Sequence, residues 1–153
     1  MESMEAFERV ILTTMCMIYD EDKILVQNKV NGEWCGLSLP GGPVSFGESL
    51  VGSLIDEVRK ETGLTVKEPQ LCGIKDWTNY DGSRNMLLLY KTNQYEGEII
   101  TAPGNEVFWA NKDELIHEEL AADLGDLFKV FQEETISEFY FFEKDGKWDH
   151  ILQ

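Results

Sequence analysis

The chain has 153 residues, 42% of them hydrophobic and 27% charged, which is ordinary for one globular domain. Its formal net charge of −16 at pH 7 argues against DNA or RNA as a partner, because nucleic-acid backbones are bound through clustered lysine and arginine. The same charge allows a small anionic ligand if a bound cation neutralises the local field, and it is equally consistent with a surface that is merely soluble.

We expect a cytoplasmic protein with no membrane association. No stretch approaches the ~18 consecutive apolar residues of a membrane span. Met1–Arg9 carries three glutamates instead of the basic start and apolar run of a signal peptide. Cys16, Cys35 and Cys72 are an odd number of cysteines in strand-like surroundings, which predicts reduced thiols in or near the core.

The first third of the chain predicts strands. Val10–Tyr19 is β-branched and apolar, as is typical of a strand. The acidic run 20–22 predicts a turn into Lys23–Val30, whose partial alternation indicates a hairpin partner for the first strand. Trp34–Leu39 leads into Pro40-Gly41-Gly42, which predicts the end of a strand.

Ser49 to Thr62 is the strongest helix prediction in the sequence. Ser49 is the expected N-cap and Gly63 the residue that ends the helix. The apolar side chains recur at helical spacing and form a stripe of Leu50, Leu54 and Val58 with Val51 and Ile55 beside it.

The remaining elements predict an α/β fold. Strands are expected at Leu71–Trp77, Asn85–Thr92 and Glu106–Ala110, a second helix at Leu120–Glu133, and a terminal aromatic hairpin at about 136–152. Strands and helices do not alternate regularly, so we expect a sandwich around a mixed sheet and not a doubly wound sheet. No repeat or linker interrupts the chain, which indicates a single domain over 1–153.

The predicted helix presents an acidic face. Glu57 and Glu61 are one turn apart on one side of it, and Glu48 comes just before its N-terminus. Gly41 and Gly42 allow a backbone to approach this face closely. We therefore expect three carboxylates to converge near a glycine loop. Carboxylate and carbonyl oxygens are the ligands that Mg²⁺ and Mn²⁺ prefer.

Residues 42–64 resemble the sequence signature of the Nudix hydrolases, the Nudix box. That signature is Gly, five residues, Glu, seven residues, then Arg-Glu-aliphatic-any-Glu-Glu-any-Gly-aliphatic. Seven of its nine fixed positions match, namely Gly42, Glu48, Glu57, Val58, Glu61, Gly63 and Leu64. The resemblance implies a Nudix fold, an α/β/α sandwich with a mixed sheet. Weaker likeness over 71–77, 106–115 and the terminal hairpin extends to the MutT type, the oxidised-nucleotide diphosphatases.

Two fixed positions depart from the family pattern. Asp56 stands where the family has an arginine that orients neighbouring carboxylates. Lys60 stands where the family has a glutamate that is commonly a metal ligand. An ammonium group cannot bind a cation, but Lys60 could pair with Glu57 or Glu61 or meet a phosphate oxygen.

The resemblance implies roles for the matching residues. The Gly41 carbonyl, Glu57 and Glu61 would hold Mg²⁺ or Mn²⁺. Glu48 would be an outer ligand or a base-side partner, and Glu57 could alternatively be the base. The substrate-binding candidates are Gly42, Lys60, Trp34, Phe46, Asn28, Trp109, Asp123 and Glu106. Among them Glu106 is the expected downstream acid of the metal site, and Trp109 could equally be a core residue.

Three functions remain open at this point. The first is a Mg²⁺-dependent hydrolase of a nucleoside diphosphate linked to another group, such as a (d)NTP or an 8-oxo-dGTP-like nucleotide. The second is a non-catalytic nucleotide-binding or regulatory module that has lost hydrolysis through Asp56 and Lys60. The third is a structural or interaction protein that uses only the fold. The expected partner is a small-molecule nucleotide, and the family also suggests a homodimer.

Overall fold

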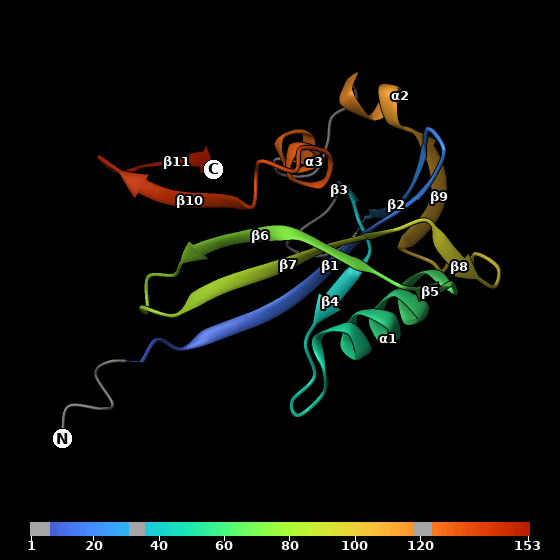
Figure 1. Cartoon of the computed structure of the whole chain (residues 1–153), viewed down its shortest axis with the longest axis horizontal. Helices are drawn as coiled ribbons and strands as arrows, with labels where there is room; N and C mark the ends of the chain where they lie inside the picture. Colours follow the sequence, from blue (N-terminus) through green and yellow to red (C-terminus); the bar gives the residue numbers. More distant parts are fainter. Residues whose placement is uncertain (1–6, 31–35, 118–123) are drawn as a thin grey trace.

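A curved mixed sheet forms the middle layer of the molecule. The computed structural model describes residues 7–30, 36–117 and 124–153. Helix α1 (Leu50–Thr62) covers one face of the sheet and helix α3 (Leu124–Gln132) the other (Figure 1). Together with the short helix α2 (Lys112–His117), they form the α/β/α sandwich expected from the sequence. In the described ranges no helix is long and apolar enough to span a bilayer.

The strands of the described residues form one nine-stranded sheet and a separate pair. The large sheet follows the order β11-β10-β6-β7-β1-β2-β3, with β4 joined to β1 and β9 to β2, and β5 pairs with β8. The bounds are β1 Val10–Asp20, β2 Lys23–Lys29, β3 Gly36–Ser38, β4 Gly41–Pro43, β5 Thr65–Lys67, β6 Gln70–Thr78, β7 Arg84–Thr92, β8 Gln94–Glu96, β9 Asn105–Asn111, β10 Glu138–Lys144 and β11 Lys147–Leu152.

Strand β1 is the point at which the sheet divides. It runs parallel to β7 from Val10 to Ile18 and antiparallel to β4. It pairs with β2 only at Tyr19–Ile24 and Asp20–Lys23, after which β2 turns away to pair with β3 and β9. The predicted hairpin is therefore confirmed at its turn but not along its length. The sides of β1 are occupied by strands that are distant in sequence.

Alternate side chains of β1 enter two separate cores. Met17 packs on the α3 side with Phe131 and Phe139. Cys16 and Ile18 pack on the α1 side, in the cluster that contains Leu54 and Val58 of the helix. Because side chains alternate across a strand, one apolar run supplies both layers of the sandwich. Cys16 and Cys72 are free thiols, as predicted, and Cys35 lies outside the described residues.

Most predicted elements are confirmed. Strand β3 ends at Ser38, just before Pro40-Gly41-Gly42, as predicted, but Gly41–Pro43 itself forms a further strand, β4. A Cβ atom on Gly41 would lie 2.1 Å from the Thr14 carbonyl oxygen, so glycine permits this close pairing with β1. Val51 is 38% exposed and so lies outside the buried stripe of α1. In the described part of the chain α3 begins at Leu124, and residues 120–123 of the predicted helix lie outside the described residues.

Candidate functional site

Helix α1 is held rigidly on the sheet. The Ser49 hydroxyl accepts a hydrogen bond from the Gly52 N–H at 2.9 Å, which caps the N-terminus as predicted. Gly63 ends the helix in the left-handed conformation, with φ of 84°. Leu54 and Val58 are fully buried against the sheet. The remaining long face of the helix, which carries Glu57 and Glu61, is thereby turned toward β4.

Strand β4 and the loop after it run alongside this face in the opposite direction. The Ser45 N–H donates to the Ser53 hydroxyl at 3.1 Å. The Gly41 N–H donates to Glu61 Oε2 at 3.5 Å. Between these contacts Gly42 faces Glu57, where a Cβ atom would lie 2.5 Å from Glu57 Oε2. The two glycines thus provide the space in which both carboxylates lie against the strand.

The other oxygen of each carboxylate faces a lysine. Glu61 Oε1 is 3.5 Å from Lys29 Nζ, and Glu57 Oε1 is 3.7 Å from Lys60 Nζ. The Glu57 side chain is only 19% exposed and that of Glu61 only 21%, because both lie close to the strand. Two carboxylates and two ammonium groups therefore balance one another in charge.

The backbone of Gly41 adds a further oxygen to this site. The Cys16 N–H donates to the Pro40 carbonyl at 2.8 Å, and the Val44 N–H donates to the Leu12 carbonyl at 3.0 Å. Antiparallel pairing alternates, so the intervening Gly41 directs its N–H and carbonyl away from β1. Its N–H meets Glu61 on that side.

Glu48 does not join the other two carboxylates. It is held at the N-terminal end of the face, where the buried Ser53 hydroxyl donates to Glu48 Oε2 at 3.3 Å. Across residues 7–30, 36–117 and 124–153, no three acidic, histidine or cysteine side chains lie close enough together to hold a metal ion. The expected convergence of three carboxylates is therefore wrong, because the helix keeps Glu48 and Glu61 at opposite ends of one face.

The donors that remain still fit a small hard cation. Glu57 and Glu61 offer two carboxylates, and Gly41 offers a carbonyl directed to the same side. Mg²⁺ and Mn²⁺ accept such oxygen ligands and keep several waters in their other positions. The space beside Gly42, which a Cβ atom would fill, lies directly at Glu57 Oε2.

The two unusual positions of the helix take part in separate ion pairs. Asp56 is 3.2 Å from Arg59 on an exposed part of the helix. It lies away from the glycine strand and does not orient Glu57 or Glu61. Lys60 instead contacts Glu57, which was one of the pairings predicted for it.

Asn105 is a site residue that the sequence did not indicate. Its Nδ2 donates to the Glu61 carbonyl oxygen at 3.4 Å, and no described residue donates to its buried Oδ1. Glu106, the predicted downstream acid, faces the opposite side of the sheet. It shares its side of β9 with Phe108 of the α3-side core, whereas Val107 belongs to the α1-side core. Residue 105, and not 106, therefore faces α1.

The other substrate-binding candidates are scattered. Asn28 pairs with Glu106 across the strands and shares its face, away from the carboxylates. Trp109 packs on the α1-side core, with its ring 5.4 Å from that of Tyr95. Phe46 is fully exposed in the loop before α1. Trp34 and Asp123 lie outside the described residues.

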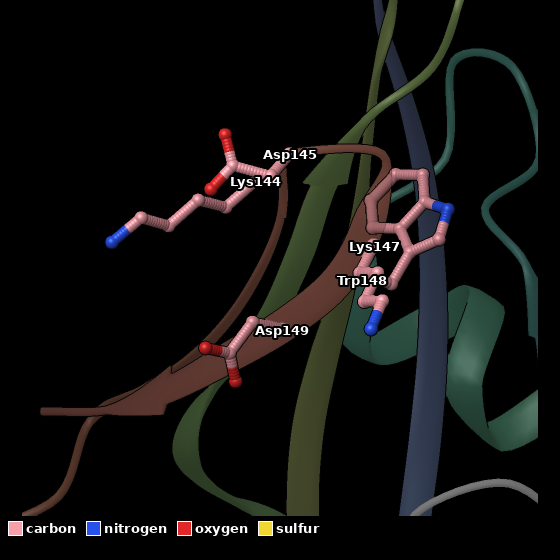
Figure 2. Close-up of a pocket in the computed structure, with 5 residues that line it drawn as sticks. All are labelled: Lys144, Asp145, Lys147, Trp148 and Asp149. Atoms are coloured by element: carbon pink, nitrogen blue, oxygen red, sulfur yellow. The ribbon is translucent and has the colours of Figure 1, made fainter.

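A shallow hollow lies at the turn of the β10–β11 hairpin, at the opposite edge of the sheet from β4. Lys144, Asp145, Lys147, Trp148 and Asp149 line it (Figure 2). Figure 2 shows these side chains spreading outward from the turn without converging on a common point. The hollow therefore lacks the convergent polar groups of a ligand site.

Comparisons with known proteins show which sequences and structures this chain resembles. The sequence model of the NUDIX domain matches residues 10–142. The protein named Uncharacterized Nudix hydrolase YvcI, from Bacillus subtilis strain 168, is 33% identical over 92 residues, which cover 58% of this chain and 57% of that protein. The chain thus matches less than two thirds of the length of this curated relative.

Solved structures share the fold over a larger part of the chain. The crystal structure of the Mutator MutT protein from Bacillus halodurans has a TM-score of 0.76 and 29% identity, covering 94% of this chain and 97% of that one. The NUDIX domain of Shewanella oneidensis NrtR, crystallised with ADP ribose, has a TM-score of 0.68 and 18% identity, covering 86% of this chain and 92% of that one. The second comparison shows a common fold only.

Proposed function

This chain belongs to the NUDIX domain family and is a MutT-type member of it, and from that premise we propose that it is a Mg²⁺- or Mn²⁺-dependent pyrophosphohydrolase. The proposed substrate is a nucleoside diphosphate linked to another group. The observation that carries the proposal is the position of the Glu57 and Glu61 side chains, which are mostly buried and lie against Gly41-Gly42.

The residues divide the work of hydrolysis among them. Glu57, Glu61 and the Gly41 carbonyl would hold the cation. When bound, such a cation neutralises phosphate oxygens and lowers the pKa of a water bound to it. The glycine strand, which has no side chains, lets the diphosphate approach the two carboxylates. Glu48, held by Ser53 at the end of the same face, would be an outer ligand or would accept the proton of the attacking water.

The substrate that we propose is a (d)NTP or an oxidised dNTP of the 8-oxo-dGTP kind. This choice is supported by the 29% identity to a MutT protein over nearly the whole chain. The net charge of −16 favours a small nucleotide over a polymer. Cytoplasmic location and homodimer formation also remain predictions.

The test is a nucleotide panel with the purified protein. Normal and oxidised dNTPs and ADP ribose are incubated with Mg²⁺ or Mn²⁺, and the release of phosphate and pyrophosphate is measured. Glu57→Gln should lower turnover by roughly 100-fold, because losing a ligand exceeds the ~10–100-fold effect of changes one shell further out. Glu114→Gln, at an exposed position of α2, is the matched control and should leave turnover unchanged. Unchanged turnover in Glu57→Gln would overturn the assignment.

A second candidate function is nucleotide binding without hydrolysis. It is favoured by Lys60, which pairs with Glu57 at a position where the family has a metal-binding glutamate. Calorimetry that shows nucleotide binding in the absence of turnover would support it. In that case the double variant Asp56→Arg/Lys60→Glu separates two causes. A large gain in rate assigns the loss to these two residues, and no gain assigns it to substrate recognition elsewhere.

A further inference from the structure

The Lys60–Glu57 pair joins an exposed cation to an enclosed anion. The Lys60 side chain is 67% exposed, whereas the Glu57 side chain is 19% exposed. Oε1 of Glu57 faces the lysine at 3.7 Å, and Oε2 faces the space beside Gly42. The ammonium group therefore lies at the solvent side of the carboxylate that is proposed to hold the cation.

Two cations then share one carboxylate. A divalent ion that binds Glu57 weakens the attraction between that carboxylate and Lys60, since both cations draw on the same negative charge. The lysine stem is a flexible four-carbon chain that ends in three donors, so its ammonium can turn to another acceptor nearby. In a loaded site the oxygens of a bound diphosphate would offer such an acceptor.

We propose that Lys60 is a built-in exchangeable cation of the diphosphate site. It neutralises Glu57 in the free protein, and once a divalent ion has taken Glu57 it binds a phosphate oxygen of the ligand. This inference rests on the proposed function, because it assumes that Glu57 holds the divalent ion. It gives the lysine a role opposite to that of the glutamate that the family carries at this position.

The inference makes two affinities move in opposite directions. Removing the ammonium should strengthen binding of the divalent ion alone, because Glu57 loses its competing partner. The same change should weaken binding of a diphosphate to the metal-loaded protein, because one charge-assisted hydrogen bond is lost. A lysine that formed only an exposed ion pair on the helix would leave the diphosphate affinity unchanged.

The experiment compares Lys60→Met with wild type in two titrations. Binding of Mn²⁺ alone is followed by electron paramagnetic resonance, and binding of imidodiphosphate, a non-hydrolysable diphosphate, is followed by calorimetry at saturating Mn²⁺. Lys60→Arg retains the charge and should keep both affinities close to wild type. Lys67→Met is the matched control, because Lys67 pairs with Glu96 on the separate two-stranded sheet.

We expect Lys60→Met to bind Mn²⁺ about 3–5-fold more tightly, in line with the loss of one exposed ion pair. We expect it to bind imidodiphosphate about 5–10-fold more weakly. The inference would be overturned if the affinities for Mn²⁺ and imidodiphosphate changed in the same direction, if neither affinity changed, or if Lys67→Met changed both affinities in the same way as Lys60→Met. If wild type binds no Mn²⁺, the proposed function falls as well. If wild type binds Mn²⁺ and hydrolyses nucleotides while Lys60→Met is unaltered, only this inference falls.

Discussion

Gly42 of strand β4 lies directly against the carboxylate of Glu57 on helix α1. A Cβ atom on Gly42 would lie 2.5 Å from Glu57 Oε2 and 2.9 Å from Glu57 Cδ, so no other residue fits without moving the carboxylate. Strand β4 is held in turn by β1, through the pairs Thr14–Gly42 and Met15–Gly41. The Glu57 carboxylate can therefore occupy its position only because residue 42, on strand β4, is a glycine and has no side chain.

Gly42→Ala should disable the site without unfolding the protein. The added methyl displaces the Glu57 carboxylate, and we expect Mn²⁺ affinity and turnover to fall by at least about 10-fold. Gly52→Ala, within the same helix, is the control for a steric change away from the carboxylate, because its methyl would lie 2.7 Å from the Ser49 hydroxyl and disturb the N-cap instead of Glu57. A Gly42→Ala protein with wild-type Mn²⁺ affinity would contradict the proposed position of the cation.

Ser53→Ala should loosen the N-terminal end of the site. The buried Ser53 hydroxyl accepts from the Ser45 N–H and donates to Glu48, so its loss removes two hydrogen bonds. We expect a loss of about 1 kcal/mol in the free energy of unfolding, measured with urea. Ser45→Ala keeps the backbone donor and should change that free energy by less than about 0.5 kcal/mol. Equal losses in the two variants would contradict this account.

Asn105 positions Glu61 through its backbone. Asn105→Ala removes the donor to the Glu61 carbonyl oxygen, so the last turn of α1 should exchange its amide hydrogens faster. Asn105→Asp keeps the size but replaces the donor with a carboxylate that repels the carbonyl. We expect the aspartate variant to exchange faster than the alanine variant and to bind Mn²⁺ several-fold more weakly than wild type. Protection that is unaltered in both would exclude this role.

Stability should fall as the pH rises through the titration of Asp76. Burial raises the pKa of Asp76 from 3.8 to about 6, and the neighbouring Glu138 adds to the rise while Arg84 opposes it. Between pH 4 and 6 the folded protein keeps a proton that the unfolded chain has released, so raising the pH favours unfolding. The change amounts to at most about 3 kcal/mol.

Asp76→Asn should remove most of this dependence in urea denaturation compared between pH 4.5 and pH 7, a range that spans most of the window. Unprotonated Asp76 leaves its buried Oδ1 without a partner among the described residues, whereas an amide there can donate to Glu138 at any pH. Arg84 also pairs with Glu8, whose pKa it lowers, but Glu8 is exposed and should contribute little. An unaltered pH slope in Asp76→Asn would show that another group is responsible.

A nucleotide together with Mg²⁺ should raise the melting temperature. A ligand at about 100 times its Kd stabilises the folded state by about 2.7 kcal/mol, which for this chain length corresponds to roughly 5–10 °C. Chelation with EDTA should abolish the shift, and in Glu61→Gln the shift should be smaller. If neither metal nor any nucleotide alters melting, the third possibility, a structural or interaction role for the fold, would be favoured.

Local patterns were enough to predict helix α1 and its carboxylates. Ser49, Gly63 and the apolar stripe mark the helix within about four turns of chain, and helical geometry then places Glu57 and Glu61 on one face. The prediction that Glu48 joins these two carboxylates is wrong, because a position next to the end of a helix does not determine the direction of the side chain. The terminal hairpin was also predicted, since its two strands and turn are adjacent in sequence.

The sequence by itself determined the helix, the spacing of its acidic residues and the family. Only the tertiary structure decided which residues from other elements contact this helix and its carboxylates. Strand β4 reaches the helix because it pairs with β1, and Lys29 and Asn105 reach Glu61 from strands that are 32 and 44 residues away. Such contacts follow from which strands become neighbours when both faces of the sheet are buried. That choice depends on packing over the whole sheet, which no local periodicity records.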